Sequence, residues 1–63
     1  MTTYNIQKGN IVRWIDPDEE CNGIYRASTS YVGDDDYGVV TIEDKDTGSK
    51  IADLYVFELE NMD

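Results

Sequence analysis

VVTIEDKDTGSKIADLYVFEL, residues 39–59, contains two runs of strand-forming residues separated by a polar loop. The first run predicts a strand from Tyr37 to Glu43, because Val40 and Ile42 alternate with polar residues and so share one inward face. Asp44–Gly48 then supplies the aspartate and glycine residues that favour turns. Two strands joined by such a loop predict a β-hairpin.

The loop Asp44–Gly48 begins with the Asp-x-Asp pattern of calcium-binding loops of the EF-hand type. Counted from Asp44, the position that such a loop needs as glycine is Ser49, and the position that it needs as a bidentate glutamate is Tyr55. The flanks are strands, whereas an EF-hand loop joins helices. We therefore predict a turn in which Gly48 adopts a positive φ, without a bound metal ion.

The second run predicts a strand from Ser49 to Val56. Its core face carries Ala52, Leu54 and Val56, and Lys50 is expected on the opposite face near the exposed Asp53. After this strand, Phe57–Glu60 is too short for an α-helix. It predicts a single 3-10 turn that places Leu59 in the core, and a very short strand after this turn stays open as an alternative. Asn61–Asp63 is expected to fray.

Two further strands are predicted before the hairpin. Ile11–Ile15 places Val12 and Trp14 on one core face, and the following Asp-Pro ends the strand. Gly23–Val32 is long for so small a protein and must bend, which the small residues Ala27 and Ser28 would tolerate. Short strands separated by regular turn signals predict an all-β domain, here a small five-stranded barrel with a 3-10 turn near its C-terminus.

The chain length and the residue counts limit the possible functions. Sixty-three residues predict one domain, 1–63, with an ordered core from about residue 6 to about residue 60. Cys21 is the single cysteine and there is no histidine, so an internal disulfide and a Cys/His zinc site are both excluded. The lone thiol and the absence of a leader or a long apolar run predict a cytoplasmic protein without a membrane segment.

Charge is the strongest compositional signal. Fourteen acidic residues against five basic ones give a formal net charge of −9. Such a field repels phosphates, so direct nucleic-acid binding is not expected, and a basic protein partner is favoured. No acid–base constellation, activated nucleophile or cofactor motif is present, so we expect neither an enzyme nor a cofactor.

The candidate binding residues are tyrosines near loop boundaries and the acidic residues beside them. They are Tyr31, Tyr37, Tyr55, Asp34, Asp35, Asp36, Asp18 and Glu19. Exposed tyrosine contributes contact area at small entropic cost, and carboxylates attract cations. Two alternatives stay open: the rings only cover the core, or Asp34–Asp36 and Asp18–Glu20 together bind Ca²⁺ or Mg²⁺ weakly. The prediction is a protein-binding surface without a metal ion.

Four segments of the sequence follow a known pattern: KGNIVRWIDP (Lys8–Pro17), NGIYRAS (Asn22–Ser28), VVTIED (Val39–Asp44) and KIADLYVFELE (Lys50–Glu60). Together they resemble SH3-like barrel proteins, in particular small acidic proteins of Bacteroides-type gut bacteria. Ala27, where valine is usual, and Tyr55-Val56, where proline is usual, depart from the pattern. The resemblance implies a five-stranded SH3-like barrel and carries no binding or catalytic residue across.

Three functions follow as expectations. The first is a non-enzymatic protein-interaction module, monomeric by default, with an acidic and tyrosine-rich surface. The second is a nucleic-acid mimic that inhibits a basic DNA-binding protein. The third is a structural or regulatory subunit of a mobile-element complex.

Overall fold

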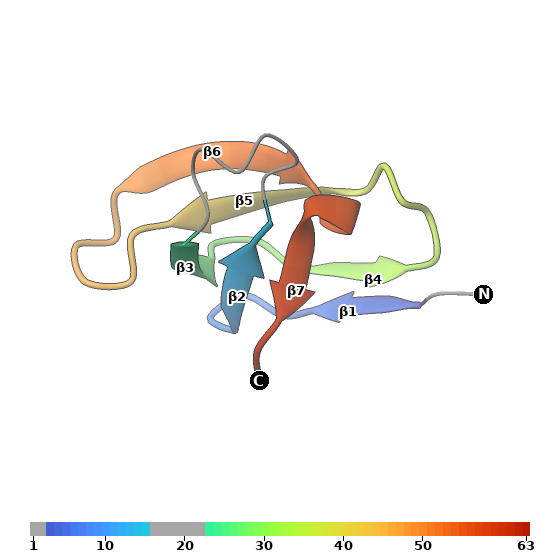
Figure 1. Ribbon diagram of the computed structural model, residues 1–63, viewed down its shortest axis with the longest axis horizontal. Coiled ribbons are helices and arrows are strands. Elements are labelled where there is room, and N and C mark those ends of the chain that lie inside the picture. Colours follow the sequence, from blue (N-terminus) through green and yellow to red (C-terminus); the bar gives the residue numbers. More distant parts are fainter. Residues whose placement is uncertain (1–2, 16–22) are drawn as a thin grey trace.

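The computed structural model describes residues 3–15 and 23–63, and seven strands and one 3-10 turn lie within them (Figure 1). The strands are β1 (Tyr4–Ile6), β2 (Ile11–Trp14), β3 (Gly23–Ala27), β4 (Tyr31–Gly33), β5 (Val39–Glu43), β6 (Lys50–Tyr55) and β7 (Leu59–Asn61), and the turn η1 (Val56–Glu58) lies between the last two. The predicted all-β class is confirmed.

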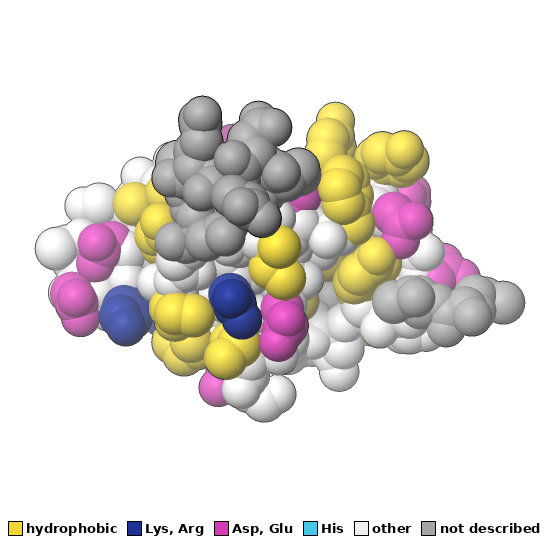
Figure 2. Space-filling view, viewed as in Figure 1, with side chains coloured by type: hydrophobic (Ala, Val, Ile, Leu, Met, Phe, Trp, Pro, Cys, Tyr) yellow, Lys and Arg dark blue, Asp and Glu magenta, His cyan; other side chains and the backbone are white. Residues whose placement is uncertain are grey.

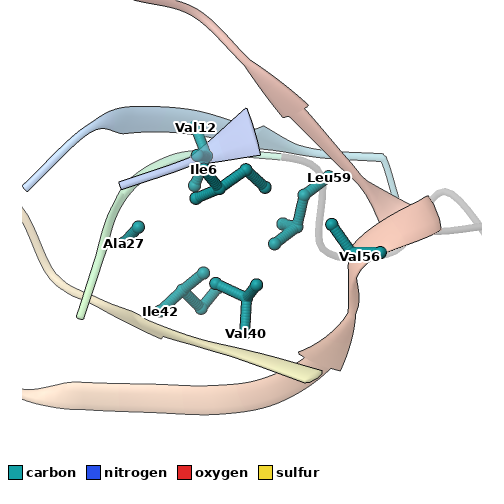
Figure 3. Packing of buried hydrophobic residues seen from close by; sticks show 7 residues of the cluster. All are labelled: Ile6, Val12, Ala27, Val40, Ile42, Val56 and Leu59. Atoms are coloured by element: carbon teal, nitrogen blue, oxygen red, sulfur yellow. The ribbon is translucent and has the colours of Figure 1, made fainter. Parts of the chain in front are cut away.

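The strands form two antiparallel sheets. The larger has the order β6-β5-β3-β2-β7, and the smaller pairs β1 with β4. The described strands do not join into one closed barrel, since β6 and β7 are the two ends of the larger sheet. The sheet is strongly bent, so its ends fold over a shared interior (Figures 1 and 3).

The core is small and aliphatic. Its buried members are Ile6, Val12, Ala27, Val40, Ile42, Val56 and Leu59 (Figure 3). The predicted inward faces of β2 and β5 are confirmed by Val12, Val40 and Ile42, each fully buried. Trp14 and Tyr25 are half-buried and pack against this cluster with their rings 6.2 Å apart. Strand alternation therefore located most of the core.

The long strand predicted over Gly23–Val32 is two strands. β3 ends at Ala27 and β4 begins at Tyr31, where the chain leaves the larger sheet to pair with β1. Side-chain oxygens of the intervening residues satisfy neighbouring backbone groups: the Thr41 amide donates to Thr29 Oγ1 and the Lys8 amide to Ser30 Oγ. The expected bend at Ala27–Ser28 is thus a change of sheet.

A β-bulge explains why Lys50 lies on the outer face of β6. Ile42 pairs with Ala52 but Glu43 pairs with Lys50, so Ile51 is an extra residue in the ladder. Lys50 thereby shares a face with Asp53, and their side chains form an ion pair at 3.0 Å. The expectation that Lys50 opposes the apolar face of this strand is confirmed.

The C-terminal residues are ordered by contacts with the start of the chain, and the expected fraying is wrong. The η1 turn buries Val56 and delivers Leu59 to the core, as predicted. β7 then pairs with β2, and Asn61 Nδ2 donates to the Asn5 carbonyl at 2.8 Å. The Ile11 amide donates to Asp63 Oδ2. The sequence analysis also missed β1, whose Ile6 is buried.

Candidate protein-binding surface

Four large hydrophobic side chains lie together on the outer surface, and we call them the aromatic patch. They are Tyr37, Val39, Tyr55 and Phe57, with exposed fractions of 69%, 55%, 46% and 48%. Val39 is the cross-strand partner of Tyr55, so the two share the outer face of the β5–β6 hairpin. Tyr37 precedes β5 and Phe57 lies in η1.

The three rings of the patch contact one another directly. Tyr37 is edge-on to Tyr55 and to Phe57, with centroids 5.5 and 6.0 Å apart, while Tyr55 and Phe57 are nearly parallel at 5.7 Å. Separations of this size are those of packed aromatic pairs. The three rings therefore pack against one another on the surface, and a partner would bind over them.

The backbone of Gly38 brings the two halves of the patch together. The Val56 amide donates to the Gly38 carbonyl at 2.7 Å, which ties η1 to the β4–β5 loop. The Gly38 amide in turn donates to the Asp35 carbonyl. Tyr37 and Phe57 are thus held side by side by main-chain hydrogen bonds, although they are far apart in the sequence.

Acidic residues flank the patch, and Lys50, on the same face of β6, is paired with Asp53. Asp34–Asp36 precede Tyr37, Glu58 follows Phe57, and Asp53 lies on the same face as Tyr55. The sequence has no Lys or Arg from residue 27 to 44 or from 51 to 63. Figure 2 shows acidic side chains beside the hydrophobic group near the end of β6 and the β4–β5 loop. The local field therefore attracts cations.

Tyr31, a predicted binding residue, is half-buried and lies inside the loop that carries the patch. Its hydroxyl donates to the Asp35 carbonyl at 3.1 Å and accepts from the Asp35 amide at 3.2 Å. Its ring also lies against Gly38, where an added Cβ would meet ring carbons at 2.4 Å. We assign Tyr31 the role of positioning this loop.

Two of the predicted acidic residues make internal hydrogen bonds. Asp35 Oδ1 accepts from the Tyr37 amide, and Asp36 Oδ1 accepts from the Tyr4 hydroxyl at 2.6 Å. The hydrogen bond to the Asp36 carboxylate raises the pKa of Tyr4, because it favours the protonated phenol. Asp34 is exposed.

The remaining predicted acidic binding residues, Asp18 and Glu19, belong to a different part of the chain. Asp18, Glu19, Glu20 and Cys21 lie outside the described residues. Within residues 3–15 and 23–63, no group of three or more acidic or cysteine side chains is placed to hold a metal ion. The proposed joint cation site is therefore represented here only by Asp34–Asp36.

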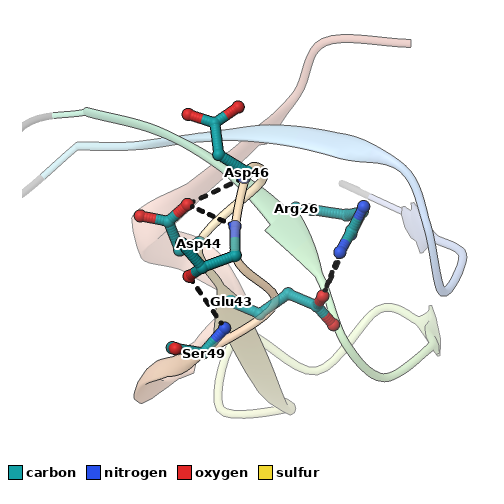
Figure 4. A network of polar contacts seen from close by, with 6 residues as sticks. Arg26, Glu43, Asp44, Asp46 and Ser49 are labelled. Carbon is teal, nitrogen blue, oxygen red and sulfur yellow. Dashed lines mark hydrogen bonds and ion pairs between the residues drawn. The ribbon is translucent and has the colours of Figure 1, made fainter.

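The loop Asp44–Gly48, at the end of the β5–β6 hairpin away from the aromatic patch, forms the turn that the sequence predicts (Figure 4). Asp44 Oδ1 accepts from the amides of Asp46 and Thr47 at 2.7 and 3.1 Å, and Gly48 has a φ of 77°. The two backbone donors lower the pKa of Asp44. With this carboxylate used by the loop itself, Asp44 serves to close the hairpin.

Sequence reasoning missed Val39 and Phe57 as members of the patch. Val39 belongs to a strand whose core face is Val40 and Ile42, so alternation alone places it outward. Phe57 is two residues after Tyr55 and lies inside the η1 turn. The sequence does not specify the direction that a side chain takes in such a turn. The signal for Val39 was therefore present, whereas Phe57 required the turn geometry.

Comparisons with known family models, curated proteins and solved structures give no match to this chain. In the described part of the chain no helix is both long and apolar enough to cross a membrane. The surface of those residues shows no pocket. The arrangement that the structure offers for recognition is the aromatic patch with its acidic surroundings.

Proposed function

We propose that this protein is a small interaction module whose aromatic patch binds a basic segment of a partner protein. The observation that carries the proposal is the grouping of Tyr37, Tyr55 and Phe57 on the surface beside a predominantly acidic set of residues. Exposed aromatic groups of this kind mark interaction sites, and tyrosine is enriched among residues that dominate binding energy.

The sheet order supports a finer assignment of the fold. The larger sheet has five antiparallel strands, its last strand β7 returns to pair with its first strand β2, and a 3-10 turn precedes β7. These features support the SH3-like arrangement that the resemblance implies. Small barrels of this kind host many functions, so the proposal depends on the patch and not on the fold.

The geometry favours this module over a nucleic-acid mimic. A mimic needs free carboxylates in a phosphate-like array. Here Asp35, Asp36, Asp44 and Asp53 accept hydrogen bonds from neighbouring groups of the same chain.

A random peptide display selection tests the proposal. Peptides retained by the wild-type protein should be enriched in Lys and Arg, and their affinity should fall with added salt. The substitution Phe57→Ala should weaken binding about tenfold or more, because it removes a central ring of the patch.

The matched control is Ile24→Ala. Ile24 is 39% exposed, but it lies at the Glu43 end of the sheet, since Arg26 pairs with Glu43. It should leave binding unchanged. Selected peptides that are neutral or acidic, or that bind the Phe57→Ala protein as tightly as the wild type, would remove the basis of the proposal.

A further inference from the structure

One long edge of the larger sheet is unpaired within the described residues. β6 is the last strand in the order β6-β5-β3-β2-β7, and it pairs only with β5. At the opposite end, β7 has only three residues. An unpaired strand is a template for pairing with another chain, so natural proteins shorten, charge or distort such strands.

Only part of β6 carries such protection. Its first half holds the bulge at Ile51 and the charged Lys50, both of which discourage pairing. Its second half, from Ala52 to Tyr55, is regular and has no proline, lysine or bulge, and its one charged residue, Asp53, is paired with Lys50. We call this half the open edge.

The register identifies the backbone groups that the open edge presents. The Val56 amide bonds to the Gly38 carbonyl, and hydrogen-bonded pairs alternate along an antiparallel ladder. Val40–Leu54 and Ile42–Ala52 are therefore hydrogen-bonded pairs. Asp53 and Tyr55 lie between these pairs, so their amides and carbonyls point away from β5.

An independent contact supports this alternation. Thr41, the partner of Asp53, directs its own backbone groups to the other side of β5: its amide donates to Thr29 Oγ1, and its carbonyl accepts from the Ser28 amide. Asp53 must likewise direct its amide and carbonyl away from Thr41. The open edge thus presents the amides of Asp53 and Tyr55 and the carbonyl of Asp53 in the spacing of a strand. Tyr55 is the N-cap of η1, the position whose carbonyl accepts the first hydrogen bond of such a turn.

The side chains along the open edge define the kind of strand that would fit. Asp53 and Tyr55 lie on the outer, acidic and aromatic face, whereas Ala52 and Leu54 lie half-buried against the core. Because side chains of a strand alternate between faces, an added strand would place basic residues on the outer face and apolar residues on the inner one.

We propose that an extended partner segment of alternating basic and apolar residues pairs with the backbone of Asp53 and Tyr55 and adds a strand to the sheet. This inference rests on the proposed function and specifies how the patch is used. The added strand would lie beside Tyr55, so its outer side chains would reach the aromatic patch. Such strand addition takes affinity from main-chain hydrogen bonds and specificity from alternate side chains.

Amide hydrogen exchange tests the geometry first. In the free protein the amides of Ala52 and Leu54 should be protected, and those of Asp53 and Tyr55 should exchange rapidly. Adding an end-blocked octapeptide of alternating lysine and valine should protect Asp53 and Tyr55. A peptide of equal composition with its lysines and valines in two blocks should protect them less. Protection of Asp53 and Tyr55 in the free protein, or equal effects of both peptides, would overturn the inference.

A pair of substitutions then isolates the backbone amide. Tyr55→Ala removes the ring and keeps the amide, while Tyr55→Pro removes both. The φ of Tyr55 is −71°, which proline adopts, and its amide makes no bond to β5, so the fold should tolerate proline. Tyr55→Pro should bind the alternating peptide about threefold to tenfold more weakly than Tyr55→Ala.

The outcomes separate this inference from the proposed function. Equal affinities of the Tyr55→Ala and Tyr55→Pro proteins would exclude strand addition. A loss of binding on Phe57→Ala would still support the patch as a protein-binding surface. If Tyr55→Pro unfolds, as judged by loss of protection at Ala52 and Leu54, the exchange experiment on the wild-type protein decides alone.

Discussion

Tyr31 and Gly38 show how two residues determine the position of a surface loop. The ring of Tyr31 occupies the space that a side chain at residue 38 would need, and its hydroxyl holds both backbone groups of Asp35. Gly38 is required for this close approach, although its φ is not positive. The sequence identified Tyr31 by its type and position. It could not reveal that the ring faces a glycine seven residues later.

Replacing Gly38 tests this contact. Gly38→Ala should reduce the free energy of unfolding by about 1–3 kcal/mol, because the new Cβ overlaps the Tyr31 ring. Urea denaturation measures the change. In a Tyr31→Ala background the same substitution should cost much less. An equal cost in both backgrounds would show that the ring is not the obstacle.

Asp44 provides a pH-dependent contribution to stability. Hydrogen bonds from the amides of Asp46 and Thr47 lower its pKa below the ordinary value of 3.8. The carboxylate therefore stabilises the fold above pH 3.8, and this contribution is lost as the pH falls through the lower pKa of the folded protein. The free energy of unfolding of the wild type should exceed that of Asp44→Asn at pH 7, and the difference should shrink in acid.

The matched control for this measurement is Asp46→Asn, which removes the same charge from the same loop. The Asp46 carboxylate accepts no hydrogen bond within the described residues, so its difference from the wild type should vary less with pH. A wild-type advantage over Asp44→Asn that stays constant from pH 7 to pH 2 would contradict the assignment.

At the scale of strands, side-chain alternation predicted faces better than it predicted ends. The inward residues of β2 and β5 were predictable because period-2 patterns report burial directly. The break after Ala27 was not, since Ser28–Ser30 is compatible with an extended strand until Thr29 and Ser30 are seen accepting backbone hydrogen bonds. β1 was missed because three residues are too few for a pattern. Its pairing is set by β4, far along the chain.

A substitution at Asn61 tests whether its side-chain hydrogen bonds stabilise the end of β7, which the sequence analysis expected to fray. Its side-chain amide donates to the Asn5 carbonyl and to Asn10 Oδ1. Asn61→Ala should lower the free energy of unfolding by about 1–2 kcal/mol through loss of these bonds. Glu60→Ala, on the exposed face of the same strand, is the control and should change it little. Equal effects of the two substitutions would indicate that the side-chain bonds contribute nothing.

At the scale of the whole molecule, charge dominates. Fourteen acidic residues share one small surface with five basic ones, and the described ion pairs use only Arg26 with Glu43 and Lys50 with Asp53. Composition predicted this excess of negative charge, and the preference for basic partners stays a prediction from it. It could not predict where the tyrosines would gather, because the patch joins a loop, a strand and a turn that only the folded chain brings together.

Salt should therefore stabilise the protein. Between about 0.02 and about 0.5 M NaCl the Debye length falls from about 20 to about 4 Å, which screens repulsion among the acidic side chains. The melting temperature should rise over this range. Sodium sulfate at equal ionic strength separates screening from surface exclusion, since an extra gain in sulfate reports the latter. A melting temperature that stays flat or falls in NaCl would show that the acidic groups are already compensated.

The pairing of β7 with β2 has a consequence for how the chain reaches its native state. The Asn61–Asn5 bond joins residues 56 positions apart, and β2 has no second neighbour in its sheet until residues 59–61 arrive. Contacts so distant in sequence slow folding, because a long loop must close before they form. During synthesis on the ribosome, β2 and β3 are translated first and the hairpin of β5 and β6 follows, while the native sheet must wait for β7. Folding is therefore expected to follow translation of β7.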